Sequence, residues 1–242
     1  MANVTIIPSE SFLQSVLPQS PEQLHPAQIN YADFNDNAAL KSASDALGFA
    51  SEGVASIDRL RANSHPEDRP ATQARKVREA VSGFDNARAA RWDGARAALK
   101  AELTRVESEL EKAANLKPIE SRFNSIVGTL QGMNHGQRAQ TIDQLIEAGD
   151  GPSLATIIEA PLFLTGLVAE QRDNIKLRLF TKVDPAGLAL RDQLVKATAK
   201  FETASIVAIH ASAKLLEGTD AFDKKAREVD EMANKARTGF AA

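Results

Sequence analysis

The chain has 242 residues, of which 43% are apolar and 25% are charged, and it contains no cysteine. The missing cysteines exclude disulfide frameworks, thiol nucleophiles and cysteine-ligated zinc. The formal net charge of −3 gives no overall field that would attract a polyanion or an acidic membrane. Alanine is abundant and aromatic residues make up only 5%, so we expect an all-α fold with a thin core between closely packed helices.

Residues 1–36 predict an extended N-terminal arm, because prolines interrupt them too often for a long helix. The segment Ser20–Gln23 has the layout of a capping box with proline at the first helical position, and it predicts a short helix. Residues 1–8 have neither a basic region nor a long apolar run, so we expect no secretory signal. The arm carries apolar residues that need a covering surface, either on the chain's own body or on a neighbouring subunit: Ile6, Ile7, Phe12, Leu13, Val16 and Leu17.

A long helical hairpin is expected over 37–115. Apolar residues between 40 and 57 recur at spacings of three and four, which is typical of a coiled-coil seam, and a second stripe of this kind lies between 77 and 110. Gly48 and Gly53 weaken the first helix by roughly 1 kcal/mol each relative to alanine. A close contact with another helix would offset that loss.

Arg88 interrupts the second stripe, because it lies between Phe84 and Trp92 on the same helix face. Two interpretations stay open. The arginine either extends past the apolar seam to the surface, or it forms an interhelix or intersubunit ion pair that sets the register. The second interpretation makes Arg88 a candidate subunit contact.

Two more helical regions follow the hairpin. Residues 118–183 predict a compact helical subdomain, because glycine and proline separate short clusters of large aliphatic side chains. Asp184-Pro185 is a helix start signal, and 185–242 predicts a C-terminal helical hairpin with helices at about 185–217 and 219–239. The first of these helices has two adjacent apolar stripes, so we expect at least two other helices to contact it.

Charge is distributed unevenly along the chain. Residues 1–68 contain nine acidic and three basic residues, whereas 69–100 contain eight basic and three acidic residues. Adjacent segments of opposite sign predict mutual packing. The alternative is that Arg75, Arg78 and Arg96 contact nucleic acid, although the basic side chains spread over most of the polar arc and lack aromatic neighbours for base stacking.

The sequence contains no constellation typical of an enzyme. The four histidines are scattered without a second ligand one helical turn away, and there is no phosphate-binding glycine loop or nucleophile elbow. Glu107, Glu109 and Glu111 lie among basic residues, as on a solvated helix face. We therefore expect no catalytic residue, metal site or cofactor. No apolar run reaches the roughly 20 residues needed to span a bilayer.

The segment Leu154–Leu167, with the sequence LATIIEAPLFLTGL, is followed by a polar helix over 169–181 and by the Asp-Pro helix start. This run of about 30 residues resembles a segment of uncharacterised, alanine-rich helical proteins of tailed bacteriophages and prophages. The resemblance implies a virion-associated or morphogenesis role and brings no active-site residues.

These observations lead to one functional hypothesis and one alternative. The hypothesis is a non-enzymatic structural or assembly protein of a tailed-phage particle, made in the host cytoplasm, which contacts itself as a homo-oligomer and contacts other virion proteins. The alternative is a nucleic-acid-associated or regulatory helical module that uses the basic segment 69–100.

Overall fold

The computed structural model describes most of the chain, and the described part is helical without any strand. The predicted all-α helical bundle is therefore confirmed. The described residues are 21–29, 31–63, 65, 68–219, 224–225, 228–229, 231–233 and 235. The α-helices within them are α2 (Ala38–Ala62), α3 (Pro70–Ala113), α4 (Phe123–Gln131), α5 (His135–Ala148), α6 (Gly151–Glu159), α7 (Leu162–Thr165), α8 (Ala169–Val183) and α9 (Pro185–Leu216). The 3-10 helices are η1 (Pro21–Leu24), η2 (Pro26–Gln28), η3 (Ala32–Phe34) and η4 (Glu120–Arg122).

The long helices lie close to their expected bounds. The helices predicted over 37–63, 71–115 and 185–217 are α2, α3 and α9. The structure adds α7, a single turn that the sequence pattern does not predict. The helix expected over 219–239 lies mostly outside the described residues. The four-part division into 1–36, 37–115, 118–183 and 185–242 stays a prediction.

The chain divides into two compact units. Unit 1 contains the described residues up to 29, Leu40–Arg96 and the described residues from Ala197 onward, whereas unit 2 contains Tyr31–Ala39 and Ala97–Lys196. The helices α3 and α9 each contribute residues to both units.

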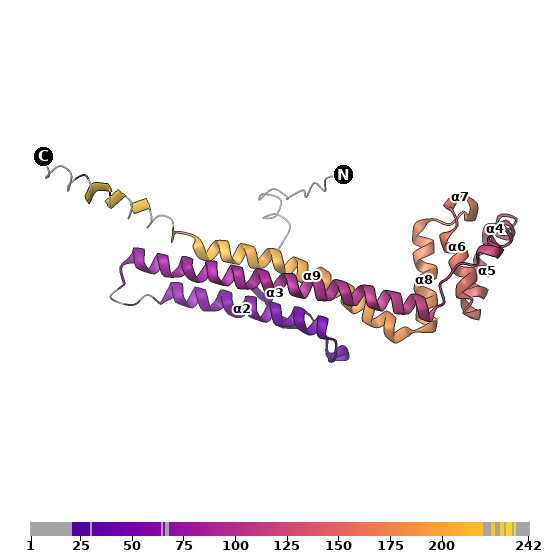
Figure 1. The fold of residues 1–242 in the computed structure, drawn as a ribbon, viewed down its shortest axis with the longest axis horizontal. Helices are drawn as coiled ribbons and strands as arrows, with labels where there is room; N and C mark the ends of the chain where they lie inside the picture. Colours follow the sequence, from indigo (N-terminus) through magenta and orange to yellow (C-terminus); the bar gives the residue numbers. More distant parts are fainter. Residues whose placement is uncertain are drawn as a thin grey trace. The chain divides into compact units, whose positions relative to one another are not determined.

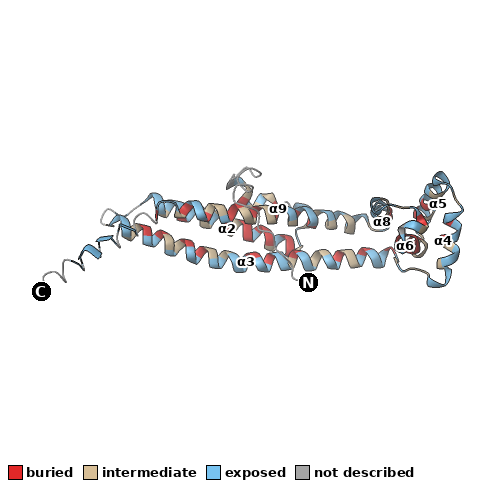
Figure 2. Ribbon diagram, turned by 90° about the horizontal axis from the view of Figure 1, so that it is seen from above, coloured by how far each residue is buried: buried red, intermediate tan, exposed pale blue. Residues whose placement is uncertain are grey.

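Unit 1 is a helical bundle in which α2, α3 and the later part of α9 run side by side (Figure 1). Trp92 of α3 stacks on Phe201 of α9, with ring centroids 4.6 Å apart. Arg61 of α2 donates a hydrogen bond to the carbonyl oxygen of Lys214 in α9 at 3.1 Å. The prediction that at least two helices contact α9 is thus confirmed. Buried residues form the predicted seams (Figure 2), and those of the α2 seam are Leu40, Ala43, Leu47, Ala50 and Ile57.

The close approach of α2 and α3 explains a glycine in the interior of α2. A Cβ atom at Gly53 would lie 2.2 Å from Cε2 of Phe84, whose ring also stacks on Phe49. A Cβ atom at Gly48 would lie 3.2 Å from Cγ of Pro26. The expected compensation for weak helix propensity is therefore present, because α3 approaches closely at Gly53 and the arm approaches closely at Gly48.

The described end of the arm packs on unit 1 of its own chain. Leu24 and Ile29 are 1% and 2% exposed. The Lys200 ammonium of α9 donates a hydrogen bond to the carbonyl oxygen of Gln28 at 2.9 Å. Residues 21–29 thus pack on their own chain, whereas the apolar residues for which the two alternatives were open lie outside the described residues.

In unit 2, the short helices α4 to α8 pack on one another within the region 118–183. Helix α5 packs on α6 and α8, while α4 packs on α6 and α7. Leu154 and Ile157 of α6 are almost fully buried. A Cβ atom at Gly151, the first residue of α6, would lie 1.7 Å from the carbonyl oxygen of Ala114. Only glycine allows this approach of α6 to the end of α3.

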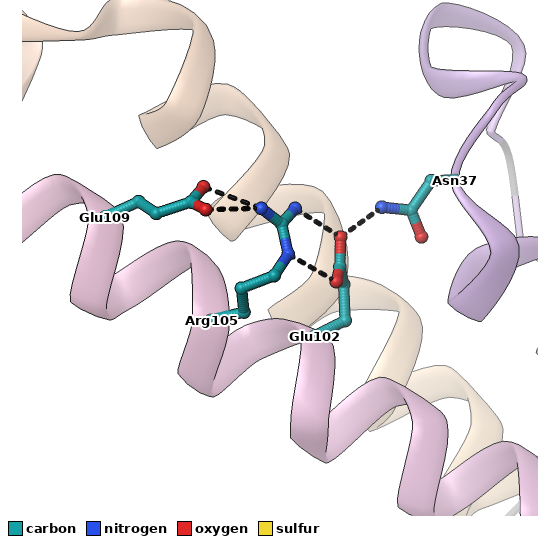
Figure 3. A network of polar contacts seen from close by, with 4 residues as sticks. All are labelled: Asn37, Glu102, Arg105 and Glu109. Atoms are coloured by element: carbon teal, nitrogen blue, oxygen red, sulfur yellow. Dashed lines mark hydrogen bonds and ion pairs between the residues drawn. The ribbon is translucent and has the colours of Figure 1, made fainter.

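A polar network in unit 2 holds the residue before α2 against α3 (Figure 3). The Asn37 amide donates to Oε1 of Glu102 at 2.8 Å. Arg105 donates to both oxygens of Glu102 at 2.8 Å and to Glu109 at 2.7 Å. The hydrogen bonds from Arg105 lower the pKa of Glu102, burial opposes them, and the bond from Asn37 lowers it further. The network therefore depends on an ionised Glu102.

Candidate interaction surfaces

Arg88 is the candidate subunit contact that the structure describes. Its side chain is 11% exposed, and its guanidinium donates to Oδ1 of Asp85 from Nη2 at 3.2 Å. The Ser212 hydroxyl of α9 donates to the same oxygen at 2.8 Å. The interpretation that Arg88 extends to the surface is wrong, because the arginine is held by a carboxylate of its own helix that also bonds α9. The ion pair described for Arg88 lies within α3, so it is not the expected interhelix pair, and a contact between Arg88 and a second subunit stays a prediction. The other candidate contacts lie outside the described residues: Ile6, Ile7, Phe12, Leu13, Val16 and Leu17.

The arginines of the nucleic-acid alternative lie in different settings. Arg96 donates to both carboxylate oxygens of Glu202 in α9, at 2.6 and 2.9 Å, and these hydrogen bonds raise its pKa. Arg75 lies 3.8 Å from Glu79 and its side chain is 69% exposed, whereas Arg78 is half-buried. A phosphate at Arg96 would have to displace a two-oxygen carboxylate contact. The alternative gains no support at Arg96 and otherwise stays a prediction.

The expected pairing of the basic segment with the acidic N-terminal third is seen at one described contact. Lys76 pairs with Asp68 at 2.6 Å. Arg88 instead pairs with a carboxylate of α3 itself, and Arg96 pairs with a carboxylate of α9. For these two arginines, the charge pattern along the chain does not identify the acidic partner.

Helix α9 carries a second apolar stripe that the bundle of unit 1 leaves partly uncovered. Ile209 is 54% exposed and Ala213 is exposed, while Ile206 and Leu216 are half-buried. The intervals between these residues are three, four and three, the spacing of a coiled-coil seam. We call these four residues the outer seam of α9.

In unit 2, two arginines from neighbouring helices hold the single turn of α7. Arg138 of α5 donates to the carbonyl oxygen of Thr165 at 3.1 Å. Arg172 of α8 donates to the Thr165 hydroxyl at 3.3 Å and also to the carbonyl oxygen of Ala160. Thr165 is 1% exposed, whereas Phe163 in the same turn is 84% exposed. A helix of four residues is unstable alone, so these hydrogen bonds fix the position from which Phe163 projects.

A groove of about 500 Å³ lies between α5 and α8, beside the residues that follow α7. Ile142, Leu167 and Ile175 provide apolar lining, and Arg138 and Arg178 also line the groove. The volume is in the range of binding pockets. We call this space the α5–α8 groove.

The three carboxylates at 107, 109 and 111 of α3 form ion pairs. The nearest cationic atoms lie 2.7 to 4.0 Å from them, as on a solvated helix face: Glu107 pairs with Arg191, Glu109 with Arg105 and Glu111 with Lys176. Within the described ranges, no three histidine or carboxylate side chains come together to hold a metal ion. A helix long and apolar enough to cross a membrane is likewise not found in the part of the chain that the structure describes.

Phe163, Arg138 and Arg172 are functional candidates that no motif in the sequence indicates. An apolar run lies between Pro161 and Gly166, and the proline and glycine that bound it indicate a turn. Which apolar residue of this turn faces solvent depends on hydrogen bonds from two other helices.

Comparison with protein-family models, with curated proteins and with solved structures finds no match for this chain.

Proposed function

We propose that this protein is a non-enzymatic structural or assembly subunit that contacts copies of itself through its helices. The observation that carries the proposal is the outer seam of α9, in which Ile209 is 54% exposed, Ala213 is exposed, and Ile206 and Leu216 at the two ends are half-buried. A stripe at these spacings packs knobs into holes when a second helix covers it. A second copy of the same seam provides such a helix.

The expected affinity of this contact is modest. Fully burying an isoleucine side chain contributes about 1.5 to 3 kcal/mol, so covering the exposed half of each Ile209 contributes about 1 kcal/mol. Association itself costs at least about 4 kcal/mol. Four seam residues from each copy therefore support a weak contact at best, toward the millimolar end, and many copies in one assembly would reinforce it.

The self-association is tested by sedimentation velocity on the full chain between about 1 µM and 1 mM, which corresponds to association free energies of about −8 to −4 kcal/mol. We expect a concentration-dependent increase in mass that Ile209→Glu removes, because a carboxylate would be buried in the seam. Ala90→Glu is the matched control, since Ala90 is an exposed residue of α3 and the charge change is the same. A wild-type chain that stays monomeric over this range would contradict the proposal.

We further propose that the assembly is a tailed-phage particle, in which the chain also contacts other virion proteins. The support for this part is the resemblance of the segment around Leu154–Leu167 and the Asp-Pro helix start. Mass spectrometry of purified particles from a phage that encodes the chain provides the test. We expect the chain in stoichiometric amount, and its absence would contradict the particle role while leaving self-association intact.

A further inference from the structure

We draw no further inference here: the strongest candidate, the α5–α8 groove of unit 2, carries nothing, because basic and acidic side chains line it together and nothing in the structure shows what covers it.

Discussion

Alanine substitutions at two glycines, Gly53 in α2 and Gly94 in α3, should change stability in opposite directions although both glycines lie inside long helices. In a helix interior, alanine is more favourable than glycine by about 1 kcal/mol. A Cβ atom at Gly94 meets nothing within 4 Å. Gly94→Ala should therefore increase the free energy of unfolding by about 1 kcal/mol.

At Gly53 the packing against α3 opposes this gain. The new Cβ atom would lie 2.2 Å from Cε2 and 2.5 Å from Cδ2 of Phe84, whereas carbon atoms pack at about 3.5 to 4.0 Å. Phe84 is 8% exposed and stacks on Phe49 at 5.8 Å, so its ring has little room to move. Overpacking of this kind costs about 1 to 3 kcal/mol. After the propensity gain, Gly53→Ala should lose about 0 to 2 kcal/mol relative to wild type.

Urea unfolding, followed by far-ultraviolet circular dichroism and by the fluorescence of Trp92, measures both variants. The double variant Gly53→Ala/Phe84→Leu is a further control, because the shorter side chain removes the clash and should make the two substitutions couple favourably. If Gly53→Ala stabilised the protein as much as Gly94→Ala, the close contact of α2 with α3 at Phe84 would be refuted.

Three further outcomes test other contacts. Because Arg105 and Asn37 hold the pKa of Glu102 below its ordinary value of 4.5, the stabilisation from Glu102 is complete above pH 4.5 and is lost as the pH falls through the lower folded pKa. Glu102→Gln should flatten the dependence of stability on pH in that acidic range, as measured by urea titrations at successive pH values. Asp85→Asn should lower the urea midpoint by an amount equivalent to about 2 kcal/mol, since it removes the carboxylate beside a guanidinium that is 11% exposed; an unchanged midpoint would contradict this ion pair. Arg172→Met should accelerate amide hydrogen exchange over 161–167 more than in α2, and uniform exchange would show that Arg172 does not hold α7.

The helix seams could be predicted from the sequence because apolar periodicity reports directly which helix face is buried. Leu47 and Ala50 of α2 show this, as does Phe201 of α9. The start of α9 could also be predicted from the Asp-Pro signal, and the Asp184 carboxylate indeed accepts a capping hydrogen bond from the Gly187 amide at 2.8 Å. Local patterns sufficed in these cases because the controlling interactions lie within one or two helical turns.

The interaction surfaces could be predicted less well. The second stripe of α9 is visible in the sequence, but its partial exposure depends on where α2 and α3 stop covering α9. The exposure of Phe163 has no sequence signal beyond an apolar turn, and the sequence pattern did not predict α7. The setting of Arg88 likewise could not be predicted, because the carboxylate that holds it also accepts a hydrogen bond from Ser212, which is 124 residues away from Arg88 along the chain.

The sequence by itself determined an all-α fold, the faces on which its long helices pack and the positions where several of them begin. Those features follow from helix periodicity and capping, which act between residues close in the chain. Only the tertiary structure decided which carboxylate each arginine contacts, why Gly53 faces Phe84, and which apolar side chains face solvent. Such outcomes depend on how closely separate helices approach one another, and a periodic pattern along one helix carries no measure of that distance.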